Sequence, residues 1–168
     1  MEPRVLRGAT LLFSAAGLTY ILDRITKLWA ESRLVEGPIE VIPGVITLKF
    51  AENPGGAFSV LTSAPWFFAA ATIGVSALIV VTAFRRRGAL QAVALGLILG
   101  GALGNLTDRA LRGPGLSGEV VDFLYLHLWP VFNIADAGIV IGAILLALSS
   151  FFEGNKAADE PTSDDHAA

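Results

Sequence analysis

Long apolar blocks alternate with shorter polar ones along this chain of 168 residues. Four blocks approach the length of a membrane-spanning helix, since roughly 20 apolar residues in a helix cross the ~30 Å hydrocarbon core of a bilayer. The pattern therefore predicts a mainly α membrane protein with four transmembrane helices, at residues 5–22, 66–84, 89–106 and 130–152.

The region between the first two blocks follows a different pattern. Residues 38–50 are rich in β-branched side chains and are interrupted by Pro43 and Gly44, which predicts short strands. The next segment, NPGGAFS at residues 53–59, is typical of a turn.

The same glycine-rich segment also has a functional interpretation. Gly55 and Gly56 suit the hinge of a mobile flap, with Phe58 as an apolar contact over a site and Asn53 as a hydrogen-bonding group. The residues alone leave the turn and the flap open as alternatives.

Arginines predict the orientation in the membrane. Arg85, Arg86 and Arg87 lie in the short turn between the second and third blocks, and cytoplasmic loops carry an excess of such residues. Arg4 and Arg7 agree, so we expect both termini to be cytoplasmic. Five basic residues fall on the opposite side and weaken the pattern: Lys27, Arg33, Lys49, Arg109 and Arg112.

Composition supports one membrane domain, at residues 1–152, followed by a disordered polar tail at 153–168. Hydrophobic residues make up 54% of the chain and charged residues 16%, against an average of about 25% charged residues in soluble domains. The net charge of −3 gives no reason to expect nucleic acid as a partner. The absence of cysteine excludes disulfides and thiol nucleophiles. A cleaved signal peptide ends in small residues. The first block does not, so we interpret it as an uncleaved span.

Glycines recur at intervals of four in the last two blocks. Small residues at this spacing let helices approach closely in lipid, and we interpret them as packing positions. They are Gly96, Gly100 and Gly104 in the third block and Gly138 and Gly142 in the fourth.

Polar residues are expected to converge at one end of the bundle. The first and third spans end on the membrane face where the fourth begins, whatever the orientation. Residues 53–59 and 119–123, as loop segments, belong to this face as well. The polar side chains brought together are Asp23, Lys27, Asn105, Asp108, Arg109, Asn133 and Asp136.

Two aspartates at this end suit hydrolysis. Asp136 lies three residues after Asn133, so the two side chains share one helical face. A carboxyl at membrane depth costs about 2.5–3.5 kcal/mol, and its presence there therefore indicates function. Asp122 is surrounded by apolar residues. Two such carboxyls would share one proton. The ionised one takes a proton from water, which attacks an amide carbonyl, and the protonated one polarises that carbonyl. This chemistry needs no metal or cofactor.

The third block ends in a second polar constellation. Asn105, Asp108 and Arg109 share a helical face. They form either an Asp–Arg cap at a helix end or a binding group, in which Asn105 and Arg109 donate hydrogen bonds to a substrate and Asp108 orients Arg109.

Other chemistries have less support. His127 is a better interfacial residue than a ligand, a zinc site needs more nitrogen or sulfur ligands, and no carboxylate cluster for Mg²⁺ is evident. If the chain were a small transporter that uses Asp136, an internal repeat would be expected, and the sequence shows none. If the chain were a non-enzymatic assembly protein, Asp122 would have no evident role, because it lies outside the spans.

Five motifs, in order, resemble the bacterial lipoprotein signal peptidases (signal peptidase II) across the four blocks. They are DRITK from Asp23, NPGGAFS from Asn53, GGALGNLTDR from Gly100, VVDF from Val120 and FNIAD from Phe132.

The resemblance implies an aspartic endopeptidase of the inner (cytoplasmic) membrane that removes signal peptides from prolipoproteins. It would cut before the diacylglyceryl-modified lipobox cysteine and be inhibited by the cyclic peptide globomycin. It also implies a small extracytoplasmic β-rich cradle and a short interfacial segment. By motif position, Asp122 and Asp136 would be catalytic and Asp23 and Lys27 supporting, while the site would be lined by Asn53, Gly56, Phe58, Asn105, Asp108, Arg109 and Asn133.

Two segments depart from the family pattern. Gly56 stands where the family often has alanine, which should loosen the flap without altering the chemistry. Residues 110–118 are long and rich in glycine, which makes the placement of Asp122 relative to the third span the least constrained part of the prediction.

Overall fold

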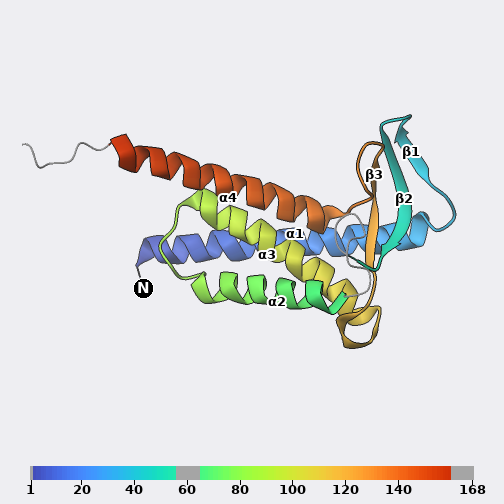
Figure 1. The fold of residues 1–168 in the computed structure, drawn as a ribbon, viewed down its shortest axis with the longest axis horizontal. Helices are drawn as coiled ribbons and strands as arrows, with labels where there is room; N and C mark the ends of the chain where they lie inside the picture. Colours follow the sequence, from blue (N-terminus) through green and yellow to red (C-terminus); the bar gives the residue numbers. More distant parts are fainter. Residues whose placement is uncertain (1, 56–64, 160–168) are drawn as a thin grey trace, which may run out of the picture.

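A computed structural model describes residues 2–55 and 65–159, and its helices lie side by side with a small sheet across one end (Figure 1). The chain order is α1 (Pro3–Arg33), β1 (Ile39–Ile42), β2 (Ile46–Asn53), α2 (Pro65–Thr82), α3 (Ala89–Leu111), the 3₁₀ turn η2 (Pro114–Leu116), β3 (Val120–Leu126) and α4 (Ile134–Asp159).

Three helices, α1, α3 and α4, are long and apolar enough to cross a membrane, within the described part of the chain. α2 contributes a shorter apolar stretch, Ala69–Thr82. The prediction of a mainly helical membrane protein is therefore confirmed, while the count of four spans stays a prediction.

Two helices extend well past their predicted ends. α1 continues to Arg33 and α3 to Leu111, beyond the predicted ends at residues 22 and 106. Both extensions carry charged side chains, and some of these pair between the two helices, as Arg24 and Lys27 of α1 do with Asp108 of α3. An isolated charged side chain favours the end of a helix in an apolar environment. A charged side chain that pairs with the neighbouring helix does not, so the helix can continue.

The limits of α4 differ from the prediction at both ends. The helix begins at Ile134, so Asn133 precedes its first turn instead of lying inside it. The helix also continues to Asp159, past the predicted border at residue 152. Residues 160–168 lie outside the described residues, and the division into a domain and a disordered tail stays a prediction.

Glycines let α3 pack against both α1 and α4. A side chain at Gly100 would collide with the Ala16 carbonyl and the Thr19 side chain of α1, and one at Gly101 would collide with Ala135 of α4. The predicted role of these glycines in packing is thus confirmed. Around them, a core cluster joins α1, α2 and α3 through Leu12, Ala16, Ile79, Ala83, Ala92 and Leu99.

This packing gives a matched pair of substitutions. Gly100→Ala is expected to lower the free energy of unfolding by about 1–3 kcal/mol, because the added methyl has no room. Gly17→Ala places the same methyl in open space on α1 and should raise stability by roughly 0.5–1 kcal/mol through helix propensity. Thermal unfolding in detergent measures both, and equal shifts for the two variants would contradict the packing role.

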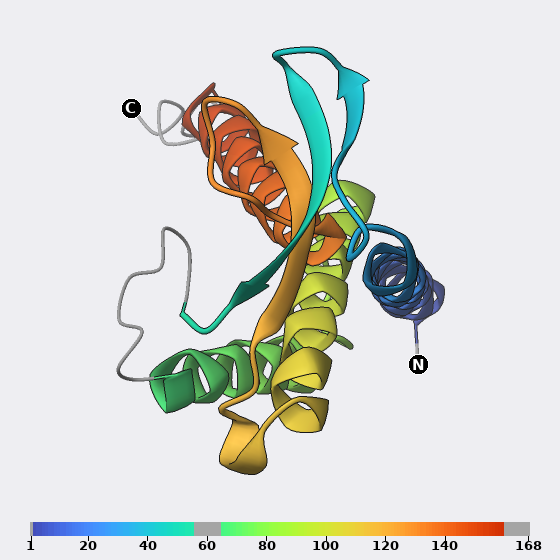
Figure 2. The ribbon, with the colours of Figure 1, turned by 90° about the vertical axis from the view of Figure 1, so that its right-hand side faces the viewer.

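The sheet is antiparallel, with strand order β1-β2-β3, and stands across the end of the helices (Figure 2). The prediction of strands within residues 38–50 is confirmed, with Gly44 at φ +72° in the connecting turn. Residues 119–123, predicted as a loop, instead lead into β3, because pairing with β2 satisfies their backbone. Phe123 packs on Ala30 and Leu34, which fixes the sheet to the end of α1.

Candidate active site

The start of α4 places Asp136 through a reciprocal cap. The Asn133 Oδ1 atom accepts a hydrogen bond from the Asp136 backbone N–H (2.9 Å), and Asp136 Oδ2 accepts one from the Asn133 backbone N–H (3.4 Å). The pair Asn133-x-x-Asp136 is therefore a capping box, in which each side chain satisfies the backbone of the other. The motif FNIAD fixes one carboxylate at a helix N-terminus, where a negative charge is stabilised.

Asp23 of α1 completes this cap. Its Oδ1 atom accepts the Ala135 backbone N–H at 2.9 Å, and the side chain is fully buried. Gly104 of α3 lies so close to this carboxylate that a side chain there would displace it. The first turn of α4 is thus held by a residue more than 100 positions earlier in the chain.

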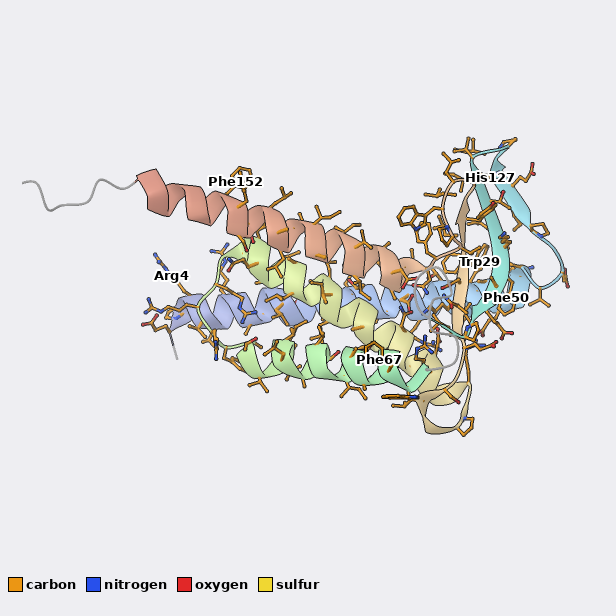
Figure 3. The ribbon with its side chains drawn as sticks, in the orientation of Figure 1. Arg4, Trp29, Phe50, Phe67, His127 and Phe152 are labelled. Carbon is orange, nitrogen blue, oxygen red and sulfur yellow. The ribbon has the colours of Figure 1, made fainter. Side chains whose placement is uncertain are left out.

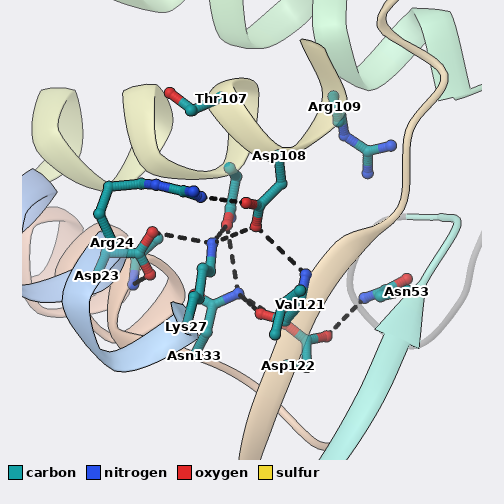
Figure 4. A network of polar contacts seen from close by, with 12 residues as sticks. Asp23, Arg24, Lys27, Asn53, Thr107, Asp108, Arg109, Val121, Asp122 and Asn133 are labelled. Carbon is teal, nitrogen blue, oxygen red and sulfur yellow. Dashed lines mark hydrogen bonds and ion pairs between the residues drawn. The ribbon is translucent and has the colours of Figure 1, made fainter. Parts of the chain in front are cut away.

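Lys27 is the centre of the buried polar network (Figure 4). Its ammonium group contacts Asp23 Oδ2 (2.9 Å), Asp108 Oδ2 (2.8 Å) and Asn105 Oδ1 (2.8 Å), and the residue is 0% exposed. The contact to Asn105 is a hydrogen bond, and the contacts to Asp23 and Asp108 are ion pairs. The buried lysine therefore joins α1 to α3 through Asn105 and Asp108.

Asp108 connects this network to the sheet. Its Oδ1 atom is paired with Arg24, and its Oδ2 atom also accepts the Val121 backbone N–H at 3.3 Å. The prediction that Asp108 orients Arg109 was wrong: the two side chains point in different directions, because α1 provides closer cations (Figure 4). Asp108 therefore holds β3 beside α3.

Arg109 is buried and faces the loops. Its Nη2 atom donates to the Gly55 carbonyl (2.6 Å) and its Nη1 atom to the Gly118 carbonyl (3.3 Å). Gly118 also donates its backbone N–H to the Arg109 carbonyl. The guanidinium thus ties the end of β2 and the start of β3 to α3. The long segment 110–118 closes back on α3 and gives Asp122 a defined place.

Asp122 lies on β3 with only 2% of its surface exposed. Its Oδ1 atom accepts from Asn133 Nδ2 (2.6 Å) and its Oδ2 atom from Asn53 Nδ2 (3.0 Å). Burial and then the charge of Asp136 raise the pKa of Asp122 to about 7, against the lowering effect of these two hydrogen bonds. This carboxyl can exchange a proton near neutral pH.

Amide side chains join the two aspartates. Asn133 donates its side-chain amide to Asp122 and its backbone N–H to Asp136. Asn105 donates to Asp136 Oδ1 at 2.8 Å and accepts from Lys27. Asp122 and Asp136 therefore lie at one site, as the sequence predicted from the end of the bundle they share.

Three features remain outside this picture. Gly56 and Phe58 lie outside the described residues, so the flap prediction is neither supported nor excluded. His127 lies 3.1 Å from the Thr47 hydroxyl and stacks on Tyr125, away from the aspartates. No group of side chains suited to a metal ion occurs among residues 2–55 and 65–152.

Two arginines near the site were not predicted from the sequence. Arg24 pairs with Asp108, and Arg112 pairs with Glu31 and with Glu52, the residue before Asn53. The motif DRITK contained Arg24, but its spacing gave no sign that it reached α3. Arg112 has no sequence signal, because its partners come from α1 and β2.

Comparisons with known proteins match nearly the whole chain. The family model described as signal peptidase (SPase) II matches residues 15–152. A lipoprotein signal peptidase of Rhodococcus jostii is 44% identical over 149 residues, which is 88% of this chain and 75% of the relative. That of Mycobacterium avium is 45% identical over 152 residues, 89% of this chain and 82% of the relative.

A solved structure has the same fold. It is a bacterial membrane enzyme determined by the in meso method at 2.3 Å resolution, with a TM-score of 0.78 and 29% sequence identity. The match covers 90% of this chain and 94% of that one.

Proposed function

The chain belongs to the signal peptidase II family, and on that premise we propose that Asp122 and Asp136 are the catalytic pair of a peptidase that removes signal peptides from prolipoproteins. The observation that carries this assignment is Asn133, which donates hydrogen bonds to both carboxylates. Two buried carboxyls held at one site support general acid–base hydrolysis of an amide.

We assign the roles from the surroundings of each carboxyl. Asp122, with a pKa of about 7, holds the shared proton and polarises the scissile carbonyl. Asp136 takes a proton from the attacking water, and the helix N-terminus together with the hydrogen bonds from Asn105 and from the Asn133 backbone N–H stabilises its carboxylate against the cost of burial. Asp122 then delivers its proton to the leaving amine. Exchange of the proton on Asp136 back to Asp122 restores the starting protonation of the pair.

The other site residues divide into two groups. Asn53, Asn105 and Asn133 contact the catalytic carboxylates directly and are suited to bind the peptide beside them. Asp23, Lys27, Asp108 and Arg109 bond to protein groups of α1, α3 and the sheet. We propose that the second group positions the first and does not contact substrate.

The substrate follows from family membership. We propose cleavage before the diacylglyceryl-modified lipobox cysteine and inhibition by globomycin in the same cleft. In vitro processing of a purified diacylglyceryl-modified prolipoprotein tests this, with unmodified prolipoprotein and globomycin as two controls. Equal cleavage of the unmodified substrate would contradict the proposed specificity.

The pH dependence tests the assignment of the proton. Activity is expected to fall as the pH rises through about 7, because Asp122 then ionises and no acid remains. Asn53→Ala removes a hydrogen bond that lowers the pKa of Asp122, so the alkaline limb should move to higher pH. The lost contact should also lower kcat/KM by about tenfold. A pH profile with an unmoved alkaline limb would argue against Asp122 as the acid.

The placement in the membrane is also a proposal. Four spans with both termini in the cytoplasm would put the aspartates at the extracytoplasmic face of the inner membrane. The native chain has no cysteine, so single cysteines report location cleanly. A membrane-impermeant maleimide should label Ser32→Cys in intact spheroplasts and label Arg86→Cys only after lysis. The reverse result would invert the proposed orientation.

A further inference from the structure

The loop between β3 and α4 is held at both ends. The Leu126 carbonyl accepts the Trp129 backbone N–H (2.7 Å), which closes a turn directly after β3. Phe132 then pairs with Leu124 of β3 through two backbone hydrogen bonds, from its own N–H (3.0 Å) and to its own carbonyl (2.8 Å). Residues 127–131 are therefore the tip of a tight hairpin whose two sides are bonded to each other.

The tip of this hairpin exposes apolar side chains. Leu128 is 100% exposed and Trp129 is 54% exposed. His127 connects the tip to the turn between β1 and β2, since its backbone N–H donates to the Val45 carbonyl (3.4 Å), and Val45 is 53% exposed. Apolar side chains left in water forgo the stabilisation that burial would give.

The two turns at this end of the sheet lack charged residues. Neither residues 41–48 nor residues 123–135 include an aspartate, glutamate, lysine or arginine. The other end of the sheet differs, because Arg112 pairs there with Glu52 of β2. An exposed apolar surface without charges marks contact with a protein or with a membrane.

The position of the loop favours a membrane as this partner. α4 is long and apolar enough to cross a membrane, and its span begins at Ile134, six residues after Leu128. The loop lies on the side of the sheet that faces the helices (Figure 1). His127 marks the sheet end of the molecule, and Phe152 lies toward the other end of α4 (Figure 3). Leu128 and Trp129 therefore lie near the boundary where α4 enters the bilayer, the depth at which tryptophan is enriched in membrane proteins.

We propose that Leu128 and Trp129 insert into the boundary between headgroups and acyl chains, beside the start of α4, and hold the sheet on the membrane surface. The bilayer is the partner that this position selects, because it surrounds α4 at this level. The peptide substrate is a poorer occupant, since the turn begins at Leu126, about 13 Å along β3 from Asp122. Because β3 carries Asp122, the contact sets the height of this carboxyl above the hydrocarbon.

Nitroxide labels in the full chain test this proposal. The chain has no cysteine, so Leu128→Cys takes a single label, with Glu40→Cys on β1 as the water control and Ile141→Cys on α4 as the lipid control. Each variant is placed in phosphatidylcholine nanodiscs that hold one copy of the chain. The accessibility of each label to oxygen and to a water-soluble nickel chelate is then measured. The ratio of oxygen to nickel accessibility at residue 128 is expected to be several-fold higher than at residue 40 and to approach that at residue 141.

Trp129 provides a second measurement without a label. In the variant Trp29→Phe/Trp66→Phe it is the only tryptophan. Lipids brominated near the headgroup end of the acyl chains are expected to quench its fluorescence more than lipids brominated near the chain ends, because the proposed depth is the boundary. Quenching by aqueous iodide, with none by either brominated lipid, would contradict the proposal.

Three results from the labels would also overturn it. The first is a label at residue 128 that is as accessible to the nickel chelate as the label at residue 40. The second is protection from both reagents, which would mean that protein covers the tip. The third is protection that appears only after a lipidated substrate peptide is added, which would make the substrate the occupant. Size exclusion and helical content verify that each variant is folded. No turnover is measured, so failure of the proposed function would leave this result unchanged.

Discussion

Asparagine in place of Asp122 or of Asp136 is expected to reduce cleavage of a diacylglyceryl-modified prolipoprotein by about 10³-fold or more. General acid–base groups contribute about 10²–10⁴-fold each, and two carboxyls that share one proton act as a unit. Asparagine keeps the shape and can still accept one of the two hydrogen bonds that each aspartate accepts, but it can neither accept the proton of water nor deliver one. Initial rates at saturating substrate measure the loss.

The loss should be chemical and not structural. Glu40→Gln on β1 is a matched control, because this acidic side chain is exposed and far along the sheet from the aspartates. All three variants should elute alike on size exclusion and retain wild-type helical content. A variant at 122 or 136 that cleaves within tenfold of the control would exclude that residue from catalysis.

Lys27→Met is expected to lower the free energy of unfolding by about 3–5 kcal/mol and to abolish activity. The substitution leaves Asp23 and Asp108 buried without their shared cation, and removal of one partner from a buried charge network has this magnitude. It also removes the donor to Asn105, which hydrogen-bonds Asp136. Asp136 would therefore lose the support of Asn105, and α1 would lose its buried contact with α3.

Lys49→Met provides the comparison for Lys27→Met. Lys49 lies 3.7 Å from the Tyr125 ring centroid on the sheet, with no buried ion pair, and its loss should change stability by about 1 kcal/mol or less. Denaturant titration in detergent distinguishes the two. Similar losses for both variants would mean that the buried network contributes little.

The end of the bundle at which the polar side chains meet could be predicted from the sequence. Helix ends alternate between the two faces of a membrane, so the position of each polar residue along its helix placed Asp23, Asn105 and Asp136 together. The sequence also predicted the strands of residues 38–50, because β-branched residues and a Pro-Gly turn are local signals. These inferences needed no knowledge of which residues touch.

Pairing between remote segments could not be predicted in the same way. Whether Asp108 pairs with Arg109 or with Lys27 depends on how α1 lies against α3, and the spacing of residues within α3 favoured the local answer. The conversion of residues near Asp122 into β3 depends on the edge that β2 offers. Asn133 and Asp136 were seen as residues on one helical face, whereas their reciprocal bonds cap the helix.

The central claim is that Asp122 and Asp136 act together on one substrate group. It is tested most directly by the distances from one oxygen atom of a bound inhibitor to the two carboxylates. The measurement is a crystal structure of the protein bound to a lipidated peptide in which a hydroxyl-bearing carbon replaces the scissile amide. The account predicts that this hydroxyl lies within about 3 Å of an oxygen of Asp122 and of an oxygen of Asp136. A hydroxyl that contacts one aspartate alone, with the other beyond the reach of a bridging water, would contradict it.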